Sequence, residues 1–243
     1  MKHRLSKLFL ALLVLCGLAA FSPPAQAGPL VLTPLPTAPG STTLVNPVTT
    51  VWVAEGDILL ASIVAPVANA SFNGIARTAV FRNNLGTLDF YYQFTNDASS
   101  LNSVTRVSTF NFGNVTTSVA QVGNGTAIFG GIFVDGTPVF GVADSASRDA
   151  APGETVGFNF TPPPLLQPGS TSFVFVIRTN ATNFSIGNFG IIDGITANAP
   201  AFAPVAQEQP IPEPATLLLF GTGLAGVGAA VRKRRRAKKS EID

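Results

Sequence analysis

The sequence is poor in the side chains that most enzymes use for chemistry. It contains one cysteine (Cys16) and one histidine (His3), both within the first 16 residues. Lysine occurs only near the two ends of the chain. The region between those ends therefore cannot build a Ser-His-Asp triad, a cysteine nucleophile, a Schiff-base lysine or a zinc site of the usual nitrogen and sulfur ligands. We expect a protein that is not an enzyme and that needs no cofactor.

A pair of carboxylates is the one catalytic arrangement left, as in glycoside hydrolysis. Glu55 and Asp57 are two residues apart, so on a strand they would share a face. The sequence Glu55-Gly56-Asp57 is equally typical of two solvent-facing charges at a turn. We favour the turn.

The N-terminal 27 residues have the pattern of a secretory signal peptide. A basic start is followed by the apolar run Leu8–Ala20 and by Ala25-Gln26-Ala27, an A-x-A cleavage site. Cleavage after Ala27 would leave Gly28 as the new N-terminus. The compartment beyond the inner membrane permits disulfides, but Cys16 would be lost, so the core alone must stabilise the mature protein.

Charge is distributed unevenly along the chain. The whole sequence has a net charge of +2, but residues 28–211 contain five arginines and ten acidic residues. The exported part is thus mildly acidic and should not bind nucleic acid or other polyanions.

The C-terminus combines three features in a fixed order. Pro212-Glu213-Pro214 precedes the uncharged run 215–231, and a basic cluster occupies 232–239. The run is near the lower limit for a transmembrane helix. Basic residues beside such a helix stay on the cytoplasmic side. The residues expected to set this topology are Arg232, Lys233, Arg234, Arg235 and Arg236.

This tail, from Ile211 to Lys239, resembles the PEP-CTERM sorting signal of Gram-negative bacteria. The resemblance implies that an exosortase recognises Pro212, Glu213 and Pro214, and that the tail is removed. It also implies transient residence in the inner membrane and onward transport to the cell surface or the extracellular matrix. Proteins of this kind are common in bacteria that make exopolysaccharide. The region is also labelled the C-terminal domain of ice-binding proteins, and no ice-binding activity follows from that label.

The tail admits other interpretations. An ordinary tail anchor would make the Pro-Glu-Pro incidental. Gly221-x-Gly223-x-x-Gly226 matches a dinucleotide fingerprint, but a basic cluster and the end of the sequence follow it instead of a βαβ unit. Small residues there suit close helix packing in a membrane. A basic cluster can bind nucleic acid, but directly after a membrane span it indicates topology.

The region between the two ends has the composition of an all-β protein. Short runs of Val, Ile, Thr and Phe alternate with turns of Asn, Gly, Asp and Pro, which predicts an antiparallel β-sandwich or jelly roll. In Leu88–Phe94, alternate residues from Leu88 should share one face. The other predicted strands are Thr49–Val53, Asp57–Val64, Gly74–Phe81, Val104–Phe112, Thr116–Val122, Thr126–Val134, Thr137–Ala143, Thr155–Phe160, Ser172–Arg178 and Phe184–Ile192.

These patterns predict three segments between the signal peptide and the sorting signal. Residues 28–46 form an extended arm, 47–198 form the β domain, and 199–211 form a Pro-rich spacer that holds the domain away from the membrane.

Two binding sites can be proposed for the domain. Asp144, Asp149 and Glu154 lie in the most acidic loop and could hold calcium, although their spacing matches no known calcium loop. A solvated loop is the simpler interpretation. A glycan site would need an exposed aromatic side chain. Trp52 is more simply a core residue, and Tyr91 is the tyrosine expected to face away from Leu88.

The sequence therefore predicts an exported protein of the cell surface or extracellular matrix, structural or adhesive, associated with exopolysaccharide. The alternative is a carbohydrate-binding module for that polysaccharide.

Overall fold

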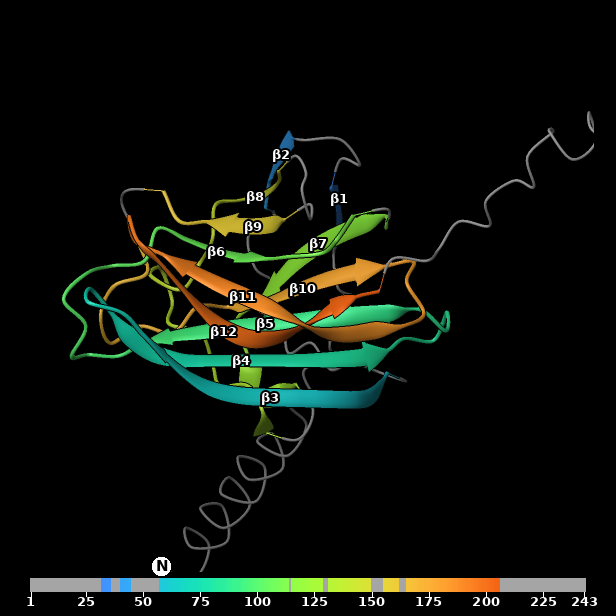
Figure 1. Cartoon of the computed structure of the whole chain (residues 1–243), viewed down its shortest axis with the longest axis horizontal. Coiled ribbons are helices and arrows are strands. Elements are labelled where there is room, and N and C mark those ends of the chain that lie inside the picture. Colours follow the sequence, from blue (N-terminus) through green and yellow to red (C-terminus); the bar gives the residue numbers. More distant parts are fainter. Residues whose placement is uncertain are drawn as a thin grey trace, which may run out of the picture. The chain divides into compact units, whose positions relative to one another are not determined.

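The computed structural model of the chain describes residues 32–35, 40–44, 57–113, 115–128, 131–149, 155–161 and 165–205. The chain divides into two compact units, Met1–Ala206 and Gln207–Asp243, and every described residue lies in the first unit. The described residues form twelve strands and one short 3-10 helix, η1 (Gly125–Ala127). The predicted all-β class is confirmed for this part of the chain (Figure 1).

The first of two antiparallel sheets has six strands in the order β1-β7-β10-β5-β4-β3. Its longest strands, β3, β4 and β5, follow one another along the chain and lie side by side. A tight turn joins β3 to β4, where the Asn69 side chain accepts hydrogen bonds from the backbone of Ser71 and Phe72. The strands are β1 (Thr33–Leu35), β3 (Ile58–Ala68), β4 (Asn73–Arg82), β5 (Leu88–Asn96), β7 (Thr117–Val122) and β10 (Val174–Thr179).

The second sheet also has six strands, in the order β12-β11-β6-β9-β8-β2. β11 and β12 pair over nine residues each. In the turn between them Gly194 has φ +109°, a backbone conformation that favours glycine. The strands are β2 (Gly40–Thr43), β6 (Arg106–Thr109), β8 (Ser145–Arg148), β9 (Val156–Asn159), β11 (Phe184–Ile192) and β12 (Thr196–Pro204).

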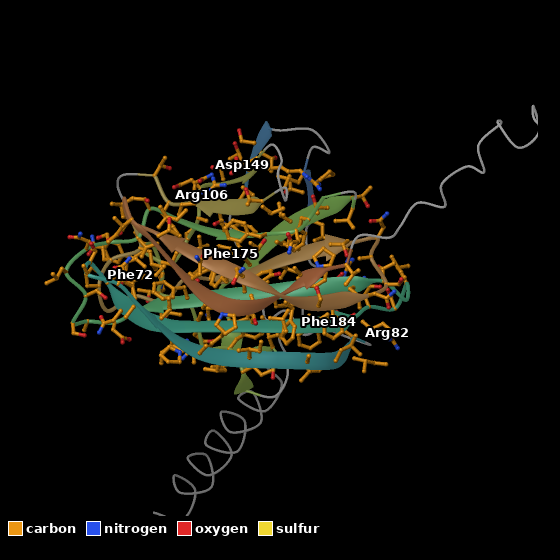
Figure 2. The ribbon with its side chains drawn as sticks, in the orientation of Figure 1. Phe72, Arg82, Arg106, Asp149, Phe175 and Phe184 are labelled. Carbon is orange, nitrogen blue, oxygen red and sulfur yellow. The ribbon has the colours of Figure 1, made fainter. Side chains whose placement is uncertain are left out.

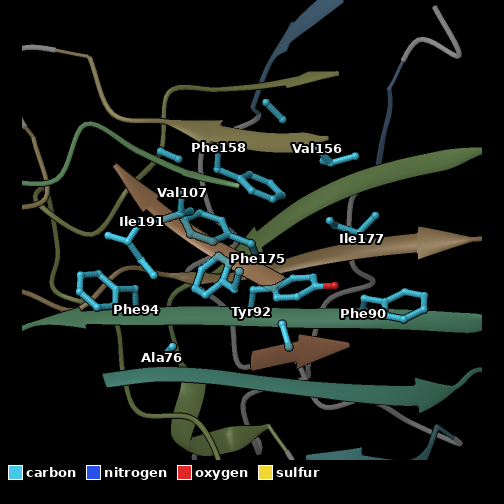
Figure 3. Packing of buried hydrophobic residues seen from close by; sticks show 14 of the residues in the cluster. Ala76, Phe90, Tyr92, Phe94, Val107, Val156, Phe158, Phe175, Ile177 and Ile191 are labelled. Atoms are coloured by element: carbon cyan, nitrogen blue, oxygen red, sulfur yellow. The ribbon is translucent and has the colours of Figure 1, made fainter. Parts of the chain in front are cut away.

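The two sheets face each other across one aromatic core (Figure 3). The rings of Phe158 on β9 and Phe175 on β10 stack with centroids 4.3 Å apart. Tyr92 on β5 packs against Phe189 on β11 at 5.4 Å. The predicted shared face of Leu88, Phe90, Tyr92 and Phe94 is confirmed, because all four side chains are buried in this core.

A second, smaller cluster covers the opposite face of the first sheet. Tyr91 and Phe81 pack there with ring centroids 4.6 Å apart, and Phe133 lies 6.2 Å from Tyr91. Ile128 completes the cover. As predicted, Tyr91 faces away from Leu88. It is buried by a covering segment, residues 125–128 and 131–134, a long-range packing contact that strand periodicity cannot show.

That covering segment corrects two predicted strands. Thr126–Val134 and Thr137–Ala143 were both expected to be strands, and the described residues there form η1, turns and irregular backbone. Two buried glutamines replace the missing strand partners. Gln93 bonds both the N–H and the C=O of Val134, and Gln121 does the same for Ala143. The apolar residues of these two segments pack over a sheet and do not pair as strands within it.

The domain also extends further at both ends than predicted. Thr196–Pro204 forms β12, so residues 199–204 of the predicted spacer belong to the second sheet. Pro200 and Pro204 fit there because β12 is an edge strand of the sheet. Within the predicted arm, Thr33–Leu35 and Gly40–Thr43 pair with β7 and β8. The predicted strand Thr49–Val53 lies outside the described residues.

Candidate functional site

The sorting and export signals lie outside the described residues. This applies to the cleavage-site residues Ala25, Ala27 and Gly28, to the motif Pro212–Pro214, and to the basic cluster 232–239. Among the described residues, no helix is both long and apolar enough to cross a membrane. The structure therefore bears on what the exported domain presents to its surroundings.

Two of the three acidic residues proposed for calcium are described, and each has other partners. Asp144 and Asp149 flank the four residues of β8, and Glu154 lies outside the described residues. Asp144 accepts hydrogen bonds from the backbone and hydroxyl of Thr161. Asp149 is bound by Arg106 and Thr155. The described residues contain no group of three or more His, Cys, Asp or Glu placed to hold a metal ion.

Arg106 links three strands on the outer face of the second sheet. Its Nη1 donates to Ser147 on β8 and to Asn159 on β9, each at 2.7 Å. Its Nη2 lies 2.6 Å from Asp149, and Figure 2 shows both charged residues on the same side of the domain. The guanidinium lies over Gly157, where a Cβ would be only 2.2 Å from Nη2. Glycine at this position lets the guanidinium lie against the sheet.

One row of small residues crosses this face. Strand register aligns residues of all six strands, and their neighbours along each strand turn inward to the core. At a strand spacing of about 4.8 Å the row is about 24 Å long. In order from β12 to β2 it consists of Asn198, Gly190, Ser108, Gly157, Ser147 and Ser41.

Phe110 lies beside this row and reaches over Gly190. A Cβ at Gly190 would be 3.4 Å from Cε2 of Phe110, 3.0 Å from Oγ of Ser108 and 3.2 Å from Oδ1 of Asn198. An aromatic ring, a hydroxyl and an amide thus converge on one glycine. Phe110 is half-buried and belongs to neither apolar cluster. We call Phe110, Arg106 and the six-residue row the polar face.

A separate charged cluster lies on the first sheet. Asp89 is fully buried and is bound by Arg178 through Nε and Nη2, at 3.0 and 2.7 Å from Oδ2. Asn83 donates to the other oxygen of Asp89 at 2.8 Å. Burial raises the pKa of the nearby Asp57 carboxyl, and the charge of Asp89 raises it further, while Arg178 opposes both. Burial, together with both carboxylates, holds the pKa of Tyr91 well above its usual value.

Of the two carboxylates considered from the sequence, Glu55 lies outside the described residues. Asp57 has Asp89 as a charged neighbour in the fold. Asp89 is already neutralised by Arg178 and held by Asn83. Asp89 is fully buried and Arg178 is partly exposed, so this ion pair holds β5 and β10 of the first sheet together.

A shallow pocket of about 290 Å³ lies at the turn between β3 and β4. Asn73 forms part of its lining and bonds Ser99 and Ser100 from the loop after β5. Leu101 at its rim is 79% exposed. The polar groups here largely bond one another, which joins the two loops.

Residues 210–236 match the family model described as the PEP-CTERM protein-sorting motif. The chain carries a PEP-CTERM sorting motif. The matched range includes Pro212–Pro214 and the basic residues through Arg236, so the resemblance found in the sequence is confirmed. No curated protein and no solved structure shows a significant match to the chain. The PEP-CTERM motif implies an exported protein that passes through a membrane-anchored stage and is processed by an exosortase.

Sequence reasoning missed the polar face of this PEP-CTERM protein. Its signal is present in residues 106–110, where Arg, Ser and Phe alternate with the buried Val107 and Thr109. Such alternation places three side chains on the outer face of the sheet, where Arg106 and Phe110 are partly exposed and Ser108 is buried. The pattern does not reveal that glycines on neighbouring strands lie beneath two of those side chains.

Proposed function

We propose that this exported protein is a structural or adhesive component of the cell surface or extracellular matrix and works alongside exopolysaccharide. Its two sheets would form a β-sandwich or jelly roll that acts through surfaces and not through a catalytic cleft. The domain would first stand on the periplasmic side of the inner membrane. Exosortase cleavage at the tail would then free it to reach the cell surface or the matrix.

The polar face is the observation that carries this proposal. Its row of small residues is about 24 Å long and is supported from beneath by the aromatic core. Asn198, Ser147 and Ser41 are accessible in it, whereas Gly190, Ser108 and Gly157 at its centre are buried. Small hydroxyl and amide groups on a rigid sheet suit broad, hydrated contact with a polymer. They do not suit enclosure of a small substrate, which needs a concave and mostly apolar pocket.

A role without catalysis is part of the proposal. Three acidic side chains of the domain are engaged in contacts that support the fold. Asp89 pairs with Arg178, Asp149 pairs with Arg106, and Asp144 accepts a hydrogen bond from Thr161. Glycoside hydrolysis needs two carboxyls facing a common substrate about 5 to 10 Å apart. Among the described residues, Asp57 and Asp89 are two carboxyls that influence each other, and both act on the buried Tyr91.

A carbohydrate-binding module is the second candidate function, and Phe110 favours it. A half-exposed ring beside Asn198 combines an apolar surface with hydrogen-bonding groups, as sugar recognition requires. This candidate differs from the first in demanding a defined binding site.

Intact-mass measurement on protein from the producing cells and from their medium tests the proposed function. We expect the medium to contain a species that lacks residues 1–27 and ends near Pro212–Pro214. A Glu213→Ala variant should keep its tail and stay with the membrane, and Glu208→Ala in the preceding segment is the matched control. A wild-type mass that extends to Asp243 in every fraction would contradict the proposal.

A further inference from the structure

The polar face holds two planar groups at a regular spacing. The Arg106 guanidinium lies over Gly157, and the Phe110 ring reaches over Gly190. The two glycines are separated in their row by Ser108 alone, so they lie two strand spacings apart, about 10 Å. Because each glycine lacks a side chain, each planar group can lie close to the sheet and turn its other side outward.

The charge of this face is balanced. Within the strands of the second sheet the charged residues are Arg106 and Arg148, and Arg148 is turned inward, where it bonds the carbonyl of Val115. The outward-facing Arg106 is neutralised by Asp149 at 2.6 Å. A phosphate or an anionic polymer would have to displace that carboxylate. The face therefore suits an uncharged ligand.

Exposed amides lie near Gly190, the glycine beside Phe110. Asn198 pairs with Gly190 across β12 and β11, Asn188 lies two residues away on β11, and both are exposed. Ser147 is the next residue of the row after Gly157. Amide and hydroxyl groups can both donate and accept hydrogen bonds, so they match the hydroxyls of a sugar. A ring among them provides the apolar surface that the carbon side of a sugar covers.

We propose that the polar face binds a neutral polysaccharide chain that lies across the strands. The chain stacks one sugar on Phe110 and a second over Arg106, and bonds Asn198, Asn188 and Ser147. This inference rests on the proposed function and identifies the partner by its chemistry: an uncharged, hydroxyl-rich polymer. No covalent step is involved.

Affinity electrophoresis of the protein purified from the producing cells tests this site. The probes are soluble neutral polysaccharides (a β-glucan, a xylan and a galactomannan) and the neutral polysaccharide of the producing cells. We expect retardation by at least one of them. Phe110→Ala should weaken binding about tenfold, the effect of losing one aromatic contact. Asn198→Ala should weaken binding by a smaller factor.

Three controls make the test specific. Leu101→Ala removes an equally apolar, more exposed side chain from a loop outside the polar face, and should bind as the wild type does. Raising the salt concentration should leave binding unchanged, because the polysaccharide is uncharged and Arg106 is already paired with Asp149. Thermal unfolding should show that Phe110→Ala and Asn198→Ala remain folded, and Asn198 is exposed enough to be replaced safely.

The outcomes separate this inference from the proposed function. A processed protein in the medium that is retarded by none of the neutral probes would overturn the site and leave the surface role standing. The site is equally overturned if only an anionic polysaccharide binds and salt abolishes that binding, or if Phe110→Ala binds normally. A protein that is never released but binds neutral glycan through Phe110 would uphold the site and contradict the matrix role.

Discussion

Arg178 binds the fully buried carboxylate of Asp89 through both Nε and Nη2, and this contact joins neighbouring strands of the first sheet. The two residues are direct partners in the pairing of β10 with β5. The side chain of Arg178 is 30% exposed, whereas that of Asp89 is not exposed at all. The pair contrasts with Arg106–Asp149, which has a similar distance of 2.6 Å but an Asp149 side chain that is 54% exposed.

Replacing the two aspartates should therefore have unequal effects. Asp89→Ala leaves Arg178 and Asn83 without their partner in a buried setting, and should lower the free energy of unfolding by about 2–3 kcal/mol. Asp149→Ala removes an exposed pair and should cost less than about 1 kcal/mol. Urea unfolding of both variants measures the difference. Equal losses would show that burial does not set the strength of these pairs.

The pH dependence of stability should carry the signature of Asp57. Its pKa is raised in the folded protein by burial first and then by Asp89. A raised pKa means that the folded state binds the proton more tightly. The contribution of Asp57 to the free energy of unfolding is thus most favourable at pH values below its pKa in the unfolded chain, about 3.8. It is lost as the pH rises through the pKa of Asp57 in the folded protein.

Asp57→Asn should for that reason stabilise the protein at neutral pH and give no advantage at strongly acidic pH. The amide keeps an oxygen that can accept a hydrogen bond but carries no charge. Thermal unfolding of the variant and the wild type, measured from strongly acidic to neutral pH, tests this effect. A variant that is less stable at neutral pH would refute the assignment.

Gln93 should control whether residues 131–134 stay packed on the first sheet. Its side chain bonds the N–H and C=O of Val134 and also the carbonyl of Ser172. Gln93→Ala leaves these buried groups unsatisfied, at a cost of about 1–3 kcal/mol for each. Limited proteolysis should then cut near residue 130, and Tyr91 should become accessible. Gln167→Ala, at an exposed position, should leave cleavage unchanged, and an uncut Gln93→Ala protein would contradict this role.

The stacked rings of Phe158 and Phe175 should contribute strongly to the pairing of the two sheets. Both are fully buried, and their planes are within 17° of parallel. Phe175→Ala should destabilise the domain by about 3–5 kcal/mol. Leu85→Ala, in the exposed turn between β4 and β5, should change the free energy of unfolding by less than about 0.5 kcal/mol. Calorimetry of both variants is the measurement, and similar values would argue against a shared core.

Sequence reasoning worked where a pattern depends on local repetition. The alternation in Leu88–Phe94 placed four side chains in the core correctly, and the strand predictions around β3, β4, β5, β7, β9, β10 and β11 overlap the observed strands. Sequence reasoning failed where a contact distant in sequence determines whether a segment joins a sheet. Thr126–Val134 has strand composition, but its described residues cover a sheet, and the Gln93 side chain bonds the backbone of Val134. Thr196–Pro204 has the prolines of a linker but pairs along one edge of β11.

The sequence by itself revealed the PEP-CTERM sorting motif, because a linear motif is read along an extended chain and does not depend on tertiary packing. It also determined the all-β class, since strand periodicity and turn residues act locally. Only the tertiary structure decided which side chains are available outside. It buried Tyr91 beneath a distant segment and left Phe110 half-exposed over Gly190. Which residue lies over which glycine depends on strand order and register, and these are set by long-range packing.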